Sequence, residues 1–319
     1  MLTETKIEKL DFSKPKNLVS LNNIKFAHWA VGEGPNLIFI HGWPLHSATF
    51  RNIIPLLSKH FTCHLFDYPG AGLSEAPEGY PYGIENIADD FIELFEYMGI
   101  DKYGLIAHDS GGAIARIIAA KDRKKVFGMV LGNTETPAEF SLLFGALVIL
   151  GRFRVGQYII DAAYRYPLLR NSIIGLKGCF SDLNKTQGDF EKFFIKNWNE
   201  NRDVRTKHYD YVRGISFASL RAVGSFHSSI TAPTMLLWGD EDPYFKVEDA
   251  KKMLNEFAGE KEFRTLEGGK LYAHEEYPER FAMEVSRFFF SVCKKSKQKS
   301  VCLHSSIMPY WSDNAQEIL

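Results

Sequence analysis

The sequence lacks features that would place it in a specialised class of protein. Its 38 basic and 39 acidic residues give a formal net charge of −1 over 319 residues, so neither a nucleic-acid surface nor an acidic partner is indicated. Only four cysteines are present, and they are scattered without the spacing of metal ligands. We therefore expect a reduced protein that holds no metal and no cofactor.

Long hydrophobic runs are also missing. The longest apolar stretch, Phe140–Leu150, is interrupted by Gly145 and is shorter than the roughly 20 residues that cross a bilayer. We interpret it as a buried or groove-lining helix. The N-terminal residues contain no apolar segment of the kind found in secretory signals. These absences predict a cytoplasmic protein with no membrane span, whose partner is a small-molecule substrate and whose oligomeric state stays open.

Hydrophobic residues make up 45% of the chain, which is enough for a sizeable core. Apolar runs typical of buried strands alternate with helical patterns, and this alternation predicts an α/β protein with a mostly parallel sheet covered by helices on both faces. The expected strands are 24–30, 36–40, 61–66, 103–107, 126–131, 234–238 and 262–265, and the expected helices are 46–59, 84–98, 111–120, 247–257 and 279–290.

The alternation stops between residues 137 and 228, where helical patterns rich in aromatic residues contain no clear buried strand. We therefore predict a core formed by residues 1–136 and 229–292, a helical cap inserted at 137–228, and a C-terminal tail at 293–319.

The segment Leu105–Gly112, with the sequence LIAHDSGG, carries the strongest chemical pattern. A strand ends and a helix begins within two residues, which strains the backbone of the residue at the tip and requires small neighbours two positions away. Asp109 has Ala107 and Gly111 at those positions, whereas Ser110 would have the bulky His108. Asp109 is therefore the predicted nucleophile, although an ordinary helix cap would also explain a single polar residue here.

The sequence His41-Gly42-Trp43-Pro44 directly follows an expected strand. A backbone amide in this turn, together with the amide of Ser110, can point at a reacting group and form an oxyanion hole. We predict Trp43 and Ser110 as the two donors.

An acid that orients a base is expected where a later strand ends. The segment Trp238–Pro243 offers Asp240 and Asp242, and the offset from Gly239 favours Asp242. Glu135, after the strand 126–131, is a third candidate. In the last loop His274 is the only histidine, and it is the candidate base.

Taken together and in this order, the motifs between about residues 24 and 290 resemble the α/β-hydrolase family, especially its aspartate-nucleophile branch of epoxide hydrolases and haloalkane dehalogenases. The resemblance implies an α/β-hydrolase fold with Asp109 as nucleophile, Trp43 and Ser110 as oxyanion donors, Asp242 as acid and His274 as base. Two positions depart from the pattern. Lys270 stands where the family usually has its histidine, and Ser110 stands where dehalogenases usually have a halide-binding tryptophan.

We therefore predict a cofactor-free hydrolase that forms an alkyl ester on Asp109 with a small apolar electrophile, in the first place an epoxide. A haloalkane dehalogenase, a serine esterase acting through Ser110, and a non-catalytic ligand-binding protein of the same fold stay open as alternatives. Aromatic residues of the cap are the candidates for contacting substrate: Tyr158, Tyr164, Tyr166, Trp198, Tyr209 and Tyr211.

Overall fold

A computed structural model describes residues 10–137 and 140–297. Its centre is an eight-stranded sheet with the strand order β1-β2-β4-β3-β5-β6-β7-β8. The strands from β4 to β8 are all parallel to β3, while β2 runs antiparallel to both β1 and β4. The strands are β1 (Asn17–Leu21), β2 (Ile24–Val31), β3 (Asn36–Ile40), β4 (Thr62–Phe66), β5 (Tyr103–Ala107), β6 (Val126–Leu131), β7 (Thr234–Gly239) and β8 (Lys261–Leu266).

The sheet confirms the α/β-hydrolase fold and the mostly parallel arrangement expected from the sequence. All five residues of β5 are buried, as are all six of β7, because helices cover both faces. The strand β1 was not expected from the sequence. It is short, lies at the edge of the sheet and exposes three of its five residues, so it carries little of the apolar pattern that marks the inner strands.

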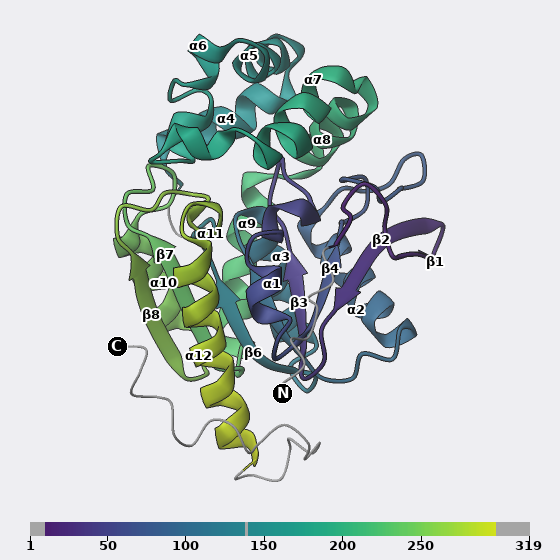
Figure 1. Cartoon of the computed structure of the whole chain (residues 1–319), viewed down its shortest axis with the longest axis vertical. Coiled ribbons are helices and arrows are strands. Elements are labelled where there is room, and N and C mark those ends of the chain that lie inside the picture. The colour runs from purple at the N-terminus through teal and green to yellow at the C-terminus, as the bar shows by residue number, and fades with distance from the viewer. Residues whose placement is uncertain (1–9, 138–139, 298–319) are drawn as a thin grey trace, which may run out of the picture.

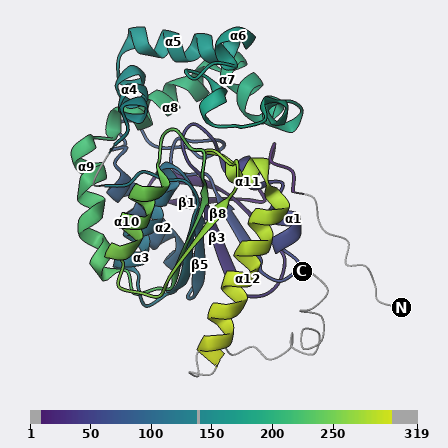
Figure 2. The same cartoon turned by 90° about the vertical axis from the view of Figure 1, so that its left-hand side faces the viewer.

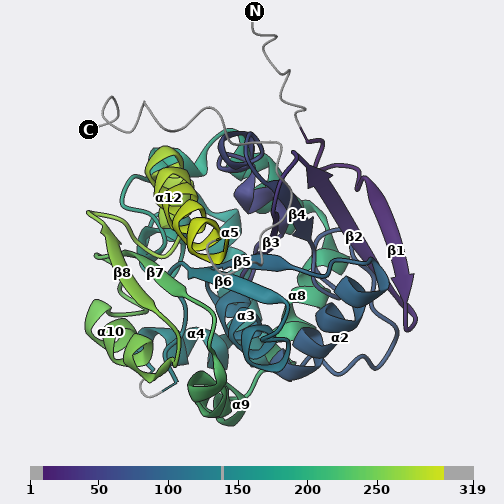
Figure 3. The same ribbon diagram turned by 90° about the horizontal axis from the view of Figure 1, so that it is seen from below.

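Two layers of helices enclose the sheet (Figures 2 and 3). The helices α1 (Ile54–Leu57) and α12 (Pro278–Lys297) lie on one face, and α2 (Ile84–Tyr97), α3 (Ser110–Lys121) and α10 (Val247–Glu256) lie on the other. The expected helix at 46–59 is in fact two short helices, η1 (Ser47–Phe50) and α1. Pro55 stands in the first turn of α1, a position that favours the start of a helix.

Between β6 and β7 the described chain is helical and contains no strand. Most of these helices form a layer above the carboxyl ends of the strands (Figure 1). They are α4 (Leu142–Arg152), α5 (Arg154–Arg165), α6 (Pro167–Arg170), η2 (Leu176–Gly178), η3 (Leu183–Thr186), η4 (Glu191–Lys196), α7 (Asn197–Glu200), α8 (Arg202–Gly214), α9 (Phe217–Ala222) and η5 (Val223–Ser229).

The last two of these helices descend from the cap layer beside the core. His227 of η5 contacts Arg116 of α3, with 3.2 Å between His227 Nε2 and an Arg116 guanidinium nitrogen. The final segment of the helical region between β6 and β7 therefore packs on the core. The predicted tail at 293–319 includes the end of α12, and its remainder lies outside the described residues.

Candidate active site

Asp109 lies between the end of β5 and the first residue of α3. Its backbone has φ 49° and ψ −140°, a region that side-chain-bearing residues seldom adopt. The turn is held at three points, because the Asp109 amide donates to the Asn133 carbonyl at 2.6 Å, and the Asp109 carbonyl accepts from Thr134 Oγ1 and from the Gly112 amide, each at 2.7 Å. The strain is thus offset by hydrogen bonds to the loop after β6 and to the first turn of α3.

Small residues make this turn possible. A Cβ atom on Gly111 would come within 2.4 Å of the Ile40 and His41 carbonyl oxygens, and one on Gly42 would come within 2.4 Å of the Asp109 Cβ atom. Glycine is therefore required on both sides of the Asp109 side chain. This crowding is the physical basis of the spacing that singled out Asp109 in the sequence.

Two backbone amides converge on the Asp109 carboxylate. The amides of Trp43 and Ser110 both lower the pKa of Asp109 through hydrogen bonds to the carboxylate. The Trp43 amide also lies 3.1 Å from Ser110 Oγ, which accepts from it. The arrangement predicted from the sequence, two amides facing one side chain at the tip of the turn, is therefore present in the geometry.

The Asp109 carboxylate faces an apolar cavity between the sheet and the cap. Side chains from α4, α5 and η2 form the upper wall, among them Leu147, Tyr164 and Leu176, and Tyr244 and Tyr272 line it from the core. Burial raises the pKa of Asp109 to about 8, with a further contribution from the carboxylate of Glu135, and this outweighs the two amides.

Glu135 is a second carboxyl group that lines the cavity. One guanidinium nitrogen of Arg116 donates to Glu135 Oε1 at 2.8 Å and to the Glu135 carbonyl at 2.9 Å, and both side chains are fully buried. Burial raises the pKa of Glu135, while Arg116 acts in the opposite direction. Glu135 is paired with Arg116, and no described histidine forms a hydrogen bond with its carboxylate. Glu135 is therefore not placed to orient a histidine.

The acid predicted first, Asp242, is buried at the end of β7 but does not contact a histidine. Asp242 Oδ1 accepts from the amides of Tyr244 at 2.7 Å and Phe245 at 3.2 Å, and Oδ2 accepts from Asn133 Nδ2 at 2.7 Å. Burial raises the pKa of Asp242 to about 7 against these bonds. The other candidate, Asp240, is exposed and accepts from the Gly268 amide at 2.8 Å.

His274 is separated from Asp242 and does not line the cavity, contrary to the expectation for a base. Its Nε2 atom lies 2.7 Å from Thr49 Oγ1, and its ring lies 4.1 Å from that of His108, on the far side of the Asp109 turn. Burial lowers the pKa of His274 to about 3, with a smaller effect of Arg51. The reason is that α11 (Ala273–Glu276) begins directly after the loop and directs His274 towards η1 instead of the cavity.

Lys270 occupies the position at which the family resemblance implies a histidine. Its Nζ atom donates to the carbonyl of Lys177 at 2.9 Å and to that of Phe180 at 3.4 Å, both in the cap. Its charge still acts on Asp242, whose pKa it lowers. The loop thus joins core to cap and supplies no imidazole to the cavity.

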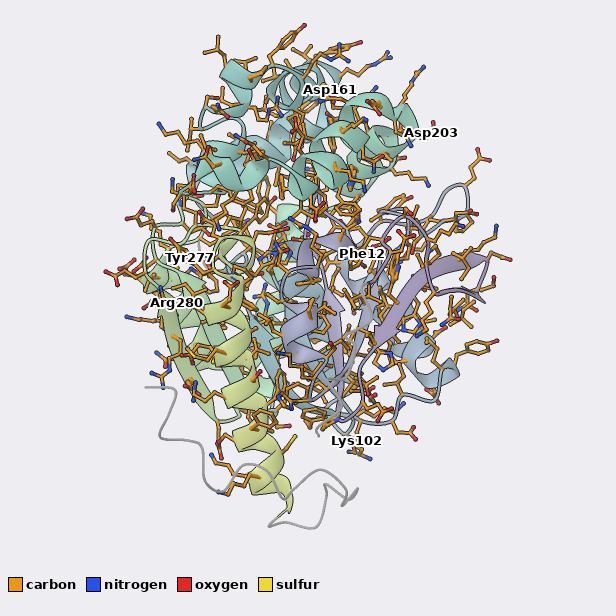
Figure 4. The ribbon with its side chains drawn as sticks, in the orientation of Figure 1. Phe12, Lys102, Asp161, Asp203, Tyr277 and Arg280 are labelled. Atoms are coloured by element: carbon orange, nitrogen blue, oxygen red, sulfur yellow. The ribbon has the colours of Figure 1, made fainter. Side chains whose placement is uncertain are left out.

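Of the six aromatic candidates in the cap, only Tyr164 lines the cavity. Tyr158 and Tyr166 are 67% and 55% exposed. Trp198 Nε1 and the Tyr209 hydroxyl both donate to Asp161, which lies in the cap (Figure 4). Tyr211 stacks on Tyr68 below the cavity with ring centroids 4.8 Å apart. Trp198 and Tyr209 therefore pack within the cap, whereas Tyr158 and Tyr166 face solvent. The buried hydroxyl of Tyr211 lies close enough to Ser110 and Asp109 to interact with both.

Several residues of the site were not predicted from the sequence. They are the cavity-lining Cys179, Tyr244 and Tyr272, and the supporting Asn133, Thr134 and Arg116. Tyr244 directly follows Asp242-Pro243 and Tyr272 lies in the last loop, so their positions in two loops of the site could have indicated them. No sequence pattern indicates Cys179 or Arg116. Among the described residues no group of three or more His, Cys, Asp and Glu side chains is placed to hold a metal ion.

Fold and site together define a hydrolase-type α/β protein, with the strained Asp109 turn at the end of β5 beneath a layer of helices. The family model described as alpha/beta hydrolase fold matches residues 35–277. The chain therefore belongs to the α/β-hydrolase family.

Among its relatives are proteins named haloalkane dehalogenase and epoxide hydrolase. Haloalkane dehalogenase 2 of Mycobacterium tuberculosis is 26% identical over 279 residues, which is 81% of this chain and 89% of that protein. Epoxide hydrolase 4 of Mus musculus is 25% identical over 252 residues, covering 72% of this chain and 66% of that protein. The soluble epoxide hydrolase of a Corynebacterium species is 36% identical over 106 residues, covering 33% of this chain and 37% of that protein.

Solved structures show the same fold. A haloalkane dehalogenase variant from Bradyrhizobium elkanii has a TM-score of 0.72 at 20% identity, covering 89% of this chain and 98% of that chain. An epoxide hydrolase without ligand has a TM-score of 0.73 at 20% identity, covering 86% of this chain and 98% of that chain.

Proposed function

We propose that the chain is a hydrolase in which the Asp109 carboxylate attacks a small, mostly apolar electrophile, in the first place an epoxide. The observation that carries this proposal is the Asp109 side chain held between the amides of Trp43 and Ser110 at the edge of an apolar cavity. A carboxylate can displace an oxygen from saturated carbon without a separate base. The new bond joins Asp109 to the substrate carbon as an alkyl ester.

Epoxide opening needs a proton for the departing oxygen. Tyr164, Tyr244 and Tyr272 line the same cavity. Burial raises the pKa of each of these hydroxyl groups, so each stays protonated and can donate. Relatives named epoxide hydrolase support this assignment, and the cap position of Tyr164 makes it our first candidate for the donor.

The site is less well suited to stabilise a halide leaving group. The residue after Asp109 is a serine, and the indole N–H of Trp43 donates to the His208 carbonyl at 3.1 Å, so it is not available to a halide. Haloalkane dehalogenation is therefore our second candidate, although a relative of greater coverage carries that name.

The second step, in which water attacks the ester carbonyl and releases the alcohol, requires a group that accepts a proton from water. Neither His274 nor another histidine lines the cavity among the described residues. Glu135 is the one further carboxyl group among the residues that line it, and we assign the proton to Glu135. Because Arg116 already holds Glu135, we expect this step to be slow and the ester to accumulate.

Intact-protein mass spectrometry tests the first step directly. The protein is incubated with 1,2-epoxyhexane or with 1-bromohexane, and diol and bromide are measured in parallel. We expect a mass increase equal to the whole epoxide in the wild type, followed by slow formation of diol. Asp109→Asn and Asp109→Ala should show neither.

The products separate the alternatives. Attachment of the hexyl group with release of bromide, and no reaction with the epoxide, would make the protein a dehalogenase. Labelling of Ser110 by a fluorophosphonate with no modification of Asp109 would indicate an esterase. No mass change and no product with either probe would contradict the proposed chemistry and favour a ligand-binding role.

A further inference from the structure

We propose that the outer face of the cap docks on the surface of an anionic lipid bilayer. We define this cap surface as the exposed side chains of residues 142–174, which include α4, α5 and α6. Figures 1 and 2 show α5 and α6 at the end of the molecule farthest from the sheet. The proposal goes beyond the chemistry at Asp109 and does not depend on it.

The cap surface holds most of the exposed apolar side chains in the described protein. Of the 16 large hydrophobic residues that are exposed, 11 fall within these 33 residues, so their distribution is not that of scattered surface residues. They are Leu142, Ile149, Phe153, Val155, Tyr158, Ile159, Tyr166, Leu168, Leu169, Ile173 and Ile174. Leu168 is 89% exposed and Phe153 65%.

Helix α5 is apolar on two sides. Ile160, Ala163 and Tyr164 are buried towards the cavity and the rest of the cap. Val155, Tyr158 and Ile159, at helical spacing on the other side, are exposed. A surface helix of a globular protein normally presents polar residues to solvent, so the outer side of α5 indicates contact with an apolar medium.

The charges on the cap surface favour an anionic partner. Residues 142–174 contain four arginines and one acidic residue, whereas the whole chain carries a net charge of −1. The acidic residue, Asp161, is directed inward and accepts from Trp198 and Tyr209 at 3.0 and 2.7 Å. Arg154 and Arg165 are exposed beside the apolar side chains. Arginines bordering an apolar face are typical of helices that lie in the interface of anionic membranes.

The geometry suits a face that lies on a bilayer and does not cross it. No single described helix is long and apolar enough to span a membrane, and α4 and α5 reach that length only as a pair, which is bent by 109°. Ile174 belongs to the cap surface, being 44% exposed, and also lines the cavity above Asp109. The mouth of the cavity therefore adjoins the proposed contact, and apolar substrates dissolved in lipid would enter from that side.

A second copy of the chain fits this surface less well than a bilayer. In a two-fold symmetric pair the same patch meets itself, so the exposed Arg154 and Arg165 of one copy would face those of the other. Like charges brought together at the border of an apolar contact oppose association, whereas phosphatidylserine headgroups complement them.

Vesicle flotation of the full chain tests the proposal. The probes are vesicles of phosphatidylcholine alone and of phosphatidylcholine mixed with phosphatidylserine. We expect the wild type to bind both and to prefer the anionic vesicles. The double variant Phe153→Gln/Leu168→Gln should bind both at least about tenfold more weakly, because two apolar anchors are lost. The variant Arg154→Gln/Arg165→Gln should lose the preference for phosphatidylserine.

Matched controls lie on the core. Leu18→Gln/Tyr97→Gln replaces side chains that are 55% and 66% exposed, and Arg123→Gln/Lys124→Gln removes two exposed charges. Both should bind as the wild type does. Asp109→Ala should also bind normally, which separates docking from catalysis. The proposal is overturned if the wild type stays unbound with both vesicles, or if core and cap variants weaken binding equally. It is also overturned if light scattering shows a dimer that Phe153→Gln/Leu168→Gln dissolves.

Discussion

The cavity floor has two sides, one at the ends of β3 and β5 and the other at the ends of β7 and β8, and they are stabilised in different ways. At the ends of β3 and β5, backbone atoms fix the Asp109 turn through amides, carbonyls and the close approach of Gly42 and Gly111. At the ends of β7 and β8, the contacts depend on particular side chains: the Asp242 carboxylate accepts from the amides of Tyr244 and Phe245 and from Asn133 Nδ2, and Lys270 Nζ donates to the cap.

This difference explains why the Asp109 turn has the geometry expected from the sequence, whereas the loop that contains Lys270 and His274 does not. A turn determined by backbone hydrogen bonds and glycine tolerates changes in many surrounding side chains. A base depends on one side chain at one position, and the position at which the family resemblance implies a histidine holds Lys270. The Asp109 turn is therefore held by its backbone, while Lys270 in the last loop makes a contact between core and cap.

The largest expected effect comes from placing a histidine at position 270. Lys270→His places an imidazole where it can reach the Asp242 region, and a positioned general base typically accelerates proton transfer by about a hundredfold or more. We expect the ester on Asp109 to decay at least that much faster, measured by mass spectrometry after removal of excess epoxide. Lys270→Gln is the matched control and should leave the ester long-lived. Equal ester lifetimes in the two variants would show that this position has no access to the reacting carbonyl.

Next in size is the effect of pH on the nucleophile end. Burial raises the pKa of Asp109 to about 8, so the reactive carboxylate is scarce below that value and dominant above it. The rate of ester formation should rise about tenfold per pH unit from pH 6 and level off above about pH 8, since one proton must leave. Initial rates of mass increase between pH 6 and 9 provide the measurement. A rate that stays constant across this range would mean that bound substrate or another group keeps Asp109 ionised.

A smaller effect, on stability alone, is expected from His274→Gln. The variant removes the contact with Thr49 and should lower the free energy of unfolding by about 1–3 kcal/mol, while ester formation and release change less than about twofold. Denaturant unfolding and the mass assay measure the two quantities. Thr49→Val is the matched control, because it removes the same contact from the other side. A strong loss of ester hydrolysis in His274→Gln alone would return His274 to the role of base.

The same histidine contributes to acid sensitivity. Its pKa is about 3 in the folded protein and near 6.5 when unfolded, so the unfolded state binds more protons between these values. Its contribution to stability is therefore complete above about pH 6.5 and is lost as the pH falls towards 3. His274→Gln should lose less stability than the wild type over this interval.

The smallest effect is expected from Ser110→Ala. The Ser110 amide still faces Asp109, and only the hydroxyl that accepts from Trp43 is removed. Ester formation should change less than about threefold, because the two amide donors are retained. Loss of all activity, with a normal circular dichroism spectrum, would identify Ser110 as the nucleophile instead.

The sequence allowed accurate prediction where the determinants are local. The central strands, the inserted helices and the turn at Asp109 depend on patterns a few residues long, such as the small residues at 107 and 111. The position of His274 depends on Thr49, which is 225 residues away, and no local pattern reports that contact. The pairing of Glu135 with Arg116 is likewise visible only after β6 and α3 have packed.

The ion pair of Glu135 and Arg116 also affects which charged molecules the cavity can bind. The cavity holds the carboxyl groups of Asp109 and Glu135, and its described lining includes no lysine, arginine or histidine. Arg116, the cation that pairs with Glu135, is fully buried and bound to it. A molecule bearing a carboxylate or phosphate would lose its hydration and meet no counter-charge. We therefore expect the cavity to disfavour anionic molecules on electrostatic grounds.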